Sequence, residues 1–339
     1  MRRFLFSTAA VLIASAAAQA DVYIPEGADG TVLHLDKEFN VVERISGLDN
    51  VHGLAGAPKR GLLIAGSLSE TASDMVEKPE AVSEEDHAAH HGGGKTPAKA
   101  PDSVSLVTLV DAKSHEILRR IEVPGIVHHV EVSADERYAM VTHPNLDSVS
   151  IIDLDAGEVT ATVATGPIPE YAIANPLTGR FFVSNAGNDT VSDVDPEAGI
   201  VTRNFRLQGA PKHMLINAEA RQLIVSEAEA GTVAIIDTET GETLNRFDIG
   251  GELHGVAADD ATVWSSARER DRVVRIDRAS GKRLEAAIGA EPYHMAKFGD
   301  ALIVSSADEN VVWILDPSTL ELRQTIKTAG TGHQFVEMN

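Results

Sequence analysis

The chain has 339 residues, no cysteine, a formal net charge of −22 at pH 7 and an aromatic content of only 4%. The lack of cysteine excludes disulfides, thiolate metal ligands and covalent c-type haem, so any bound metal would be held by imidazole and carboxylate groups. The acidic charge argues against nucleic acid and anionic membranes as partners, and the low aromatic content argues against a base-stacking or sugar-binding platform.

The first 20 residues have the pattern of a secretory signal peptide. A basic start, an apolar run and the small-residue ending Ala18-Gln19-Ala20 predict cleavage after Ala20 and export to the periplasm. The apolar run is shorter than the roughly 20 residues that span a bilayer, so a membrane anchor is the weaker interpretation. We therefore expect residues 21–339 to form a single domain that does not insert into a membrane.

A four-stranded unit is clearest at residues 209–249. Four short runs there, HMLI, QLIVSE, TVAIID and TLNRFDI, are β-branched or alternating and are separated by turn-like segments, which is the pattern of an antiparallel meander. An aspartate closes the third run. Equivalent aspartates recur every 39–42 residues, apart from one interval of 75, at Asp36, Asp111, Asp153, Asp195, Asp237, Asp277 and Asp316. A period of about 40 residues with four strands per unit predicts a β-propeller.

The two ends of the chain hold incomplete units that complement each other. Residues 21–46 supply only the second, third and fourth strands of a unit, and residues 331–338 match the missing first strand. Joining them pairs edges that would otherwise stay open and holds both termini in place. The sequence therefore predicts an all-β, seven-bladed β-propeller of four-stranded antiparallel blades, with the last blade closed by both chain ends.

The interval of 75 residues contains an insertion at about 67–103, which we expect to be flexible because it is rich in Ala, Glu, Gly and Pro. Its segment EEDHAAHHGGG places histidines at i, i+3 and i+4, and short His-rich tracts are typical of metal-binding segments. Asp86, His87, His90 and His91 are thus candidate ligands of a secondary, low-affinity metal site. A solvated linker is the alternative. Since the insertion joins a second strand to a third, it should lie at the end of the channel where first strands begin.

Six of the seven predicted first strands carry a histidine, and the remaining strand carries Tyr171 at the aligned position. First strands are innermost in a propeller, so these side chains should form a ring at one end of the axial channel. Three or four of them, from adjacent blades, would suit one Zn²⁺ ion. The candidates are His52, His129, His213, His254, His294 and His333, with His128 less favoured. The alternative is a bracing role like that of the Gly-His pair in WD40 propellers, although the chain lacks the matching Trp-Asp signature.

Repeats such as ERYAMVTHPNLDSVSIIDLDAGEV (136–159) and GRFFVSNAGNDTVSDVDPEAG (179–199) are YVTN-like. Together with the signal peptide, the cysteine-free acidic propeller, the channel histidines and the His-rich tract, they make the chain resemble the AztD family of periplasmic zinc chaperones. The resemblance covers the whole chain in outline. It implies zinc binding and delivery of zinc to an AztC-like solute-binding protein of a zinc ABC transporter.

We expect a monomer that is not an enzyme, and two other functions compete with the carrier. Some seven-bladed propellers are metal-dependent lactonases, which use an axial divalent ion as a Lewis acid. Histidine in place of carboxylate and Asn at the channel positions weighs against calcium or magnesium chemistry. The other competitor is a metal-free YVTN-type protein-binding scaffold. No Ser-His-Asp set, phosphate loop or dinucleotide motif is present.

Overall fold

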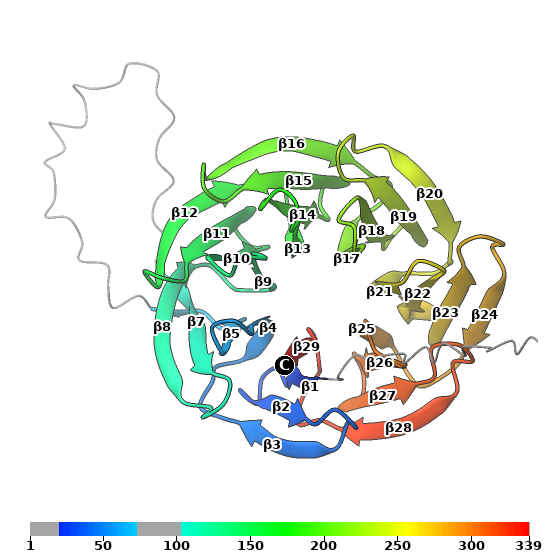
Figure 1. Cartoon of the computed structure of the whole chain (residues 1–339), viewed down its shortest axis with the longest axis horizontal. Helices are drawn as coiled ribbons and strands as arrows, with labels where there is room; N and C mark the ends of the chain where they lie inside the picture. The colour runs from blue at the N-terminus through cyan, green and yellow to red at the C-terminus, as the bar shows by residue number, and fades with distance from the viewer. Residues whose placement is uncertain (1–19, 73–102, 339) are drawn as a thin grey trace, which may run out of the picture.

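The computed structural model describes residues 20–72 and 103–338, and it shows a ring of seven antiparallel β-sheets around a central axis (Figure 1). The predicted all-β, seven-bladed propeller is therefore confirmed. The sheets are numbered here as blades 1 to 7 in the order in which the chain enters them. Residues 1–19, 73–102 and 339 lie outside the described part of the chain.

Blades 1 to 3 contain both described ends of the chain and the insertion. Blade 1 is formed by β29 (Val336–Met338), β1 (Asp21–Pro25), β2 (Val32–Leu35) and β3 (Val41–Ile45). Blade 2 is formed by β4 (Val51–Ala57), β5 (Leu62–Ser67), β7 (Ser103–Asp111) and β8 (Ile117–Pro124), and the short β6 (Thr71–Ala72) also pairs with β7. Blade 3 is formed by β9 (Val130–Val132), β10 (Tyr138–His143), β11 (Ser148–Asp153) and β12 (Glu158–Ala164).

Blades 4 to 7 are regular four-stranded units. Blade 4 is formed by β13 (Pro169–Ala174), β14 (Phe181–Asn185), β15 (Thr190–Asp195) and β16 (Ile200–Arg206). Blade 5 is formed by β17 (Pro211–Ile216), β18 (Gln222–Glu227), β19 (Thr232–Asp237) and β20 (Thr243–Asp248). Blade 6 is formed by β21 (Leu253–Ala258), β22 (Thr262–Ala267), the 3₁₀ turn η1 (Arg268–Arg270), β23 (Arg272–Asp277) and β24 (Arg283–Ala286). Blade 7 is formed by β25 (Pro292–Phe298), β26 (Ala301–Ser306), β27 (Val311–Leu315) and β28 (Leu322–Lys327).

The recurring aspartate holds the turn between the third and fourth strands of each blade. In blade 5, Asp237 Oδ1 accepts hydrogen bonds from the backbone N–H groups of Glu239 and Thr240 at 2.9 and 2.7 Å. Asp153 makes the same pair of bonds in blade 3. These bonds favour the charged carboxylate and lower the pKa of both aspartates. The period seen in the sequence is thus the period of a turn in which an aspartate side chain satisfies backbone donors.

Apolar side chains fill each interface between neighbouring blades. The cluster between blades 2 and 3, for example, includes Ile64 and Val107 from one blade and Val130 and Val141 from the next, all fully buried. Alternate residues of each strand point to opposite faces of a sheet, so every blade contributes to two such clusters. The hydrophobic core is therefore a closed series of layers between blades, and each layer depends on both of its blades.

The ring is closed by pairing of the two chain ends. β29 lies antiparallel to β1, with Asp21 opposite Met338 and Tyr23 opposite Val336. Val336, Met338 and Phe335 are all buried, and they pack into the clusters on either side of blade 1. The predicted closure is confirmed, and it places the C-terminal strand next to the axis (Figure 1).

Deleting residues 330–339 is expected to abolish cooperative unfolding. The deletion would expose the inner edge of β1 and remove buried Phe335, Val336 and Met338 from two interblade clusters. Each such side chain is worth about 1.5–3 kcal/mol when buried, a large share of the stability of one domain. Circular dichroism during heating would measure the effect, with the exposed substitution Glu337→Gln in the same strand as control. An unchanged melting transition in the truncated protein would contradict closure by pairing.

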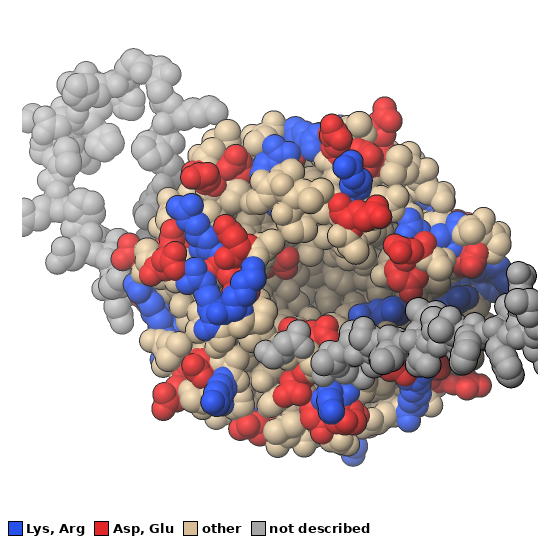
Figure 2. All heavy atoms as spheres, viewed as in Figure 1, with Lys and Arg blue, Asp and Glu red and all other residues tan. Residues whose placement is uncertain are grey.

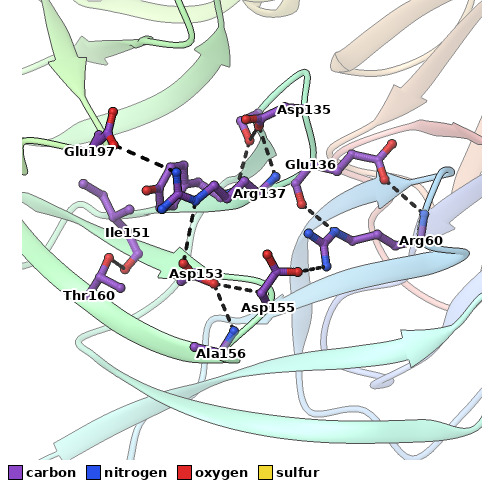
Figure 3. Close-up of polar contacts among 12 residues, drawn as sticks. Arg60, Asp135, Glu136, Arg137, Ile151, Asp153, Asp155, Ala156, Thr160 and Glu197 are labelled. Carbon is purple, nitrogen blue, oxygen red and sulfur yellow. Dashed lines mark hydrogen bonds and ion pairs between the residues drawn. The ribbon is translucent and has the colours of Figure 1, made fainter.

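Polar contacts link the turns of neighbouring blades at the end of the ring where first strands finish (Figure 3). Arg60, in the turn after β4, donates from Nε to the backbone oxygen of Glu136 at 2.6 Å and contacts Asp155 at 2.7 Å. The Glu136 carboxylate accepts the backbone N–H groups of Lys59 and Arg60. Exposed ion pairs contribute little stability, so the buried Glu136 carboxylate is the more effective link between blades 2 and 3.

Candidate metal centre

The first strands begin with a β-bulge that turns two consecutive residues toward the channel. In blades 4 to 7 the pairing with the second strand shifts by one residue at this point. A bulge places two residues opposite one, so both side chains leave the regular in-and-out alternation. Each blade thus directs two successive residues toward the axis. The first lies nearer the mouth of the channel, and the second lies deeper inside it.

The histidines predicted from the sequence do not occupy one equivalent position, so the single ring is wrong. In blade 6 the histidine lies two residues before the first regularly paired residue, Val256, whereas in blade 7 it lies one residue before the corresponding residue, Met295. The structure therefore has two rings. The mouth ring contains His52, His128, Glu170, Lys212, His254, Tyr293 and His333. The inner ring contains Gly53, His129, Tyr171, His213, Gly255, His294 and Gln334.

Close approach of the backbone explains why the inner ring has glycine in blades 2 and 6. A Cβ atom on Gly255 would lie 2.6 Å from the backbone oxygen of Tyr293, and one on Gly53 would lie 3.0 Å from the backbone carbon of His129. A side chain at Gly255 would require the backbone to shift, and one at Gly53 would require the neighbouring backbone to move by a few tenths of an ångström. Among the described residues, the imidazole that each of these two blades presents to the axis therefore lies one residue earlier, in the mouth ring.

Three imidazoles of the mouth ring come together. His52, His128 and His333 belong to the adjacent blades 2, 3 and 1, and one ligand nitrogen from each lies within 4.8 Å of the other two. The rings of His52 and His333 stack with centroids 3.7 Å apart. Buried His52 Nε2 and His333 Nδ1 have no hydrogen-bond partner among the described residues. A buried imidazole nitrogen without a hydrogen-bond partner destabilises the folded protein. Such a nitrogen could instead coordinate a metal ion.

A carboxylate from the next blade lies beside this cluster. His128 Nδ1 is 3.0 Å from the backbone oxygen of Glu170, and His128 Nε2 is 3.2 Å from Glu170 Oε2. If Nδ1 carries the proton and donates to the backbone oxygen, the Nε2 lone pair faces a carboxylate oxygen. Two acceptors at this distance need a proton or a metal cation between them. The donor set of three imidazoles with a neighbouring carboxylate fits Zn²⁺.

Tyr171 belongs to the inner ring and makes polar contacts with the mouth ring. Its hydroxyl is 3.0 Å from His254 Nε2 and 2.9 Å from His333 Nε2, and its own side chain is fully buried. Burial raises the pKa of the Tyr171 phenol well above its usual value of 10, so the hydroxyl stays neutral. Because the Tyr171 hydroxyl is hydrogen-bonded to His333 Nε2, the nitrogen of His333 that remains free to bind a metal is Nδ1. His254 also stacks on Tyr293 with centroids 3.8 Å apart.

The inner ring makes bracing contacts. Gln334 Nε2 donates to His129 Nε2 at 3.3 Å, and the backbone N–H of Val256 donates to His213 Nδ1 at 2.9 Å. His294 packs against His213 with centroids 4.4 Å apart. These contacts are of the kind that the bracing alternative expects for His129 and His213, although His129 Nδ1 has no hydrogen-bond partner among the described residues. The geometry of a metal cluster is found in the mouth ring, which includes His128, the less favoured candidate.

Burial favours the neutral imidazole of His52, His213, His254 and His333. It lowers the pKa of His52, His254 and His333 well below 6.5, and neighbouring imidazoles lower it further. In the inner ring, burial lowers the pKa of His213 to about 3. Neutral imidazole is the form that binds metal. We therefore expect His52 and His333 to remain available to a metal at pH values below 6.5, the value that an unperturbed histidine would set.

One pocket is lined by residues of the mouth ring and another by residues of the inner ring. At the mouth, a pocket of about 530 Å³ is lined by His52 together with Asn50, Arg268, Tyr293 and Asn310. Inside, a pocket of about 350 Å³ is lined by His129, Glu131, His213 and His294. Burial raises the pKa of the Glu131 carboxyl to about 7. The ring of blades surrounds a central depression in the molecular surface (Figure 2).

The insertion begins beside the mouth ring, as the strand directions predicted. Ser67, the last residue of β5, pairs with Val51, which precedes His52 in the chain. Glu70, further along the insertion, accepts hydrogen bonds from Ser103 and Asn145. The strand β6 shows that the insertion starts with a short paired segment. The candidate ligands Asp86, His87, His90 and His91 lie outside the described residues.

Among known proteins, only solved structures resemble this chain, and they resemble it in fold. No protein-family model and no curated protein matches the chain. Many solved structures have a similar fold. The periplasmic gluconolactonase PpgL of Pseudomonas aeruginosa has a TM-score of 0.68 and 16% identity over 93% of this chain and 98% of its own. A putative 6-phosphogluconolactonase of Bacteroides fragilis has a TM-score of 0.69 and 13% identity over 94% and 99%.

Hydrazine synthase of Kuenenia stuttgartiensis is also similar, with a TM-score of 0.64 and 14% identity over 95% of this chain and 99% of that one. At such low identities the likeness shows only a shared β-propeller fold and does not transfer an activity. Within residues 20–72 and 103–338, no helix is long and apolar enough to cross a membrane.

Proposed function

We propose that this protein is a periplasmic zinc carrier that holds Zn²⁺ in the mouth of its propeller channel and delivers it to the solute-binding protein of a zinc ABC transporter. The observation that supports zinc most directly is the cluster of His52, His128 and His333, whose ligand nitrogens lie within 4.8 Å of one another. Carboxylate-rich sites suit calcium or magnesium, whereas neutral imidazoles with one carboxylate suit zinc.

Each residue of the cluster has a distinct task in this proposal. His333 is fully buried, and Tyr171 fixes its ring by bonding Nε2, so Nδ1 is presented to the ion. His52 and His128 are half-buried and border the mouth. Glu170 holds His128 in place and supplies negative charge beside the ion. Such outer partners orient an imidazole ligand and increase its basicity.

Unequal burial suits release as well as binding. A partner protein can approach an ion from the mouth, where His52 and His128 are partly exposed, and replace these ligands before the buried His333. The net charge of −22 would favour docking of a basic surface and would attract cations to the mouth. The His-rich segment of the insertion, expected from the sequence at the same end of the channel, would raise the local zinc concentration there.

Direct transfer to a solute-binding protein is the test of this function. Zinc-loaded protein mixed with the metal-free solute-binding protein of a zinc ABC transporter should transfer its zinc faster than a chelator buffer set to the same free Zn²⁺ concentration. Metal content after separation of the two proteins would measure the transfer. His143→Gln is the matched control, because the nitrogens of His143 are bonded to the backbone oxygen of Ile126 and the hydroxyl of Ser150, not to the cluster. Transfer no faster than from the chelator buffer would exclude a carrier.

A metal-dependent hydrolase of the lactonase type is the second candidate. The observation in its favour is the mouth pocket of about 530 Å³, in which Arg268 and Tyr293 lie near His52 and could contact a small anionic substrate. A zinc ion would serve there as a Lewis acid. Assays of zinc-loaded protein with gluconolactone and phosphogluconolactone would decide. Turnover that is lost in Arg268→Ala, with zinc still bound, would support the hydrolase over the carrier.

A further inference from the structure

A second group of metal-ligating side chains lies at the interface between blades 1 and 2, outside the channel. His34, Glu43 and His115 each offer one ligand atom within 4.8 Å of the other two. His34 lies in β2 and Glu43 in β3, and the two are directly opposite each other in blade 1. His115 comes from the turn between β7 and β8 in blade 2. The group lies at the end of the ring opposite the mouth ring, where third strands finish.

The backbone places these side chains together by two local devices. Tyr23, His34 and Glu43 are paired across three neighbouring strands, so their side chains lie in one row on the same face of blade 1. His115 adopts a left-handed conformation, with φ of 59°, in the turn that Asp111 holds. The corresponding turn residues of other blades, such as Gly157 and Leu320, also have positive φ, so the conformation is a property of this turn. It places the His115 ring beside Glu43, with Nδ1 3.2 Å from Glu43 Oε1.

His34 has the surroundings of a metal ligand. Its Nε2 is 2.8 Å from Asp21 Oδ2, and the ring of Tyr23 stacks on it with centroids 4.4 Å apart. The side chain is about nine-tenths buried, and Nδ1 has no hydrogen-bond partner in the described part of the chain. A carboxylate bonded to one imidazole nitrogen fixes the tautomer and directs the other nitrogen toward a metal. The neighbouring Asp21 also brings a second carboxylate to the cluster.

We propose that His34, Glu43 and His115 form a second binding site for Zn²⁺ or a similar divalent transition metal, with Asp21 as a supporting carboxylate. Two imidazoles and a carboxylate are the protein ligands of many four-coordinate zinc sites. Glu43 and His115 border solvent, which gives an ion access, while His34 is buried. A bound ion would connect blade 1, which contains both chain ends, to blade 2. This site therefore stabilises ring closure, and it does not depend on the proposed carrier function.

The test counts zinc ions in full-length protein. Elemental analysis after dialysis against a zinc buffer should show one equivalent fewer in the double variant Glu43→Gln/His115→Ala than in the wild type. We expect the Kd of this site to rise by more than the about 10- to 100-fold that loss of an outer partner costs. Added Zn²⁺ should also raise the melting temperature less in the variant, because its folded state has one fewer site to bind. Glu38→Gln, an exposed acid in the next turn, is the control.

Two outcomes separate this site from the channel and the loop. A background variant that lacks His52, His128 and the three loop histidines should keep one equivalent of zinc and lose it on addition of the double substitution. If the channel proposal fails, the wild type should still lose one equivalent in Glu43→Gln/His115→Ala and none in His52→Ala. An unchanged zinc count in the double variant, in either background, would show that these residues only form ion pairs and would overturn the proposal.

Discussion

Replacing His128 or His52 by alanine is expected to weaken zinc binding in the channel by about 100-fold, because each supplies one of the three imidazoles that cluster in the described part of the channel. Zinc sites with four ligands have apparent binding free energies of about 10–16 kcal/mol, so one ligand carries about 2.5–4 kcal/mol, equivalent to a Kd change of roughly 100-fold or more. Competition with a chelator of known affinity would measure it. Glu170→Gln should have a smaller effect, about 10- to 100-fold, because Glu170 acts mainly through His128.

His213→Ala is the matched control for the channel prediction. His213 is also a buried channel imidazole, but it accepts the backbone N–H of Val256 and belongs to the inner ring. Its loss should leave the zinc Kd unchanged and lower stability by about 1–3 kcal/mol, since a buried donor loses its partner. Equal loss of zinc affinity in His213→Ala and His128→Ala would contradict the division of the histidines into a binding ring and a bracing ring.

The fold could be predicted because its repeat is a local feature. Asp237 and its equivalents are fixed by bonds to backbone groups two and three residues further along the chain, so their spacing in the sequence reports the spacing of turns. Both incomplete end units could likewise be recognised from strand patterns alone. Ring closure then follows, because an unpaired β1 would be an open edge.

The candidate site was predicted less well because register within the channel depends on the β-bulge. Aligning the histidines by residue type places His254 with His294, but the strand pairing separates them by one position. Glu170 was missed for the same reason, since it is the mouth-ring residue of blade 4 and precedes the Tyr171 that the alignment identified. Counting back from the third-strand aspartate separates His254, 23 residues before Asp277, from His294, 22 residues before Asp316. The count differs in the other blades, so it does not recover both rings.

The pair His34 and His115 could not be found from the sequence. These residues are far apart in the chain and come from different blades, and only the packing of blade 1 on blade 2 brings them within reach of Glu43. Sequence repeats predict which residues are equivalent in different blades, whereas this site is made of residues that are not equivalent. Contacts of this kind require the relative placement of neighbouring sheets.

Mild acid is expected to unfold the metal-free protein, in a pH range set by its buried histidines. Burial lowers the pKa of seven imidazoles: His52, His129, His143, His213, His254, His294 and His333. Below pH 6.5 the unfolded chain binds protons at these residues and the folded protein does not, so stability falls as pH falls. Glu131 acts in the opposite direction, because its raised pKa of about 7 lets the folded state take up one proton first.

The expected size of this effect approaches the whole stability of a domain. At pH 5.5 each neutral buried imidazole lowers the free energy of unfolding by about 1.4 kcal/mol, and Glu131 raises it by about 2 kcal/mol. The net decrease is about 8 kcal/mol, whereas the whole free energy of unfolding of a domain is usually about 5–15 kcal/mol. Urea unfolding at a series of pH values, in a chelator, would measure a net uptake of about six protons on unfolding. His143→Gln should reduce that number by about one. The turn aspartates, including Asp237, have lowered pKa values and can destabilise the fold only below about pH 4. Stability that stays constant down to pH 4 would therefore show that the channel imidazoles are solvated or charged in the folded protein.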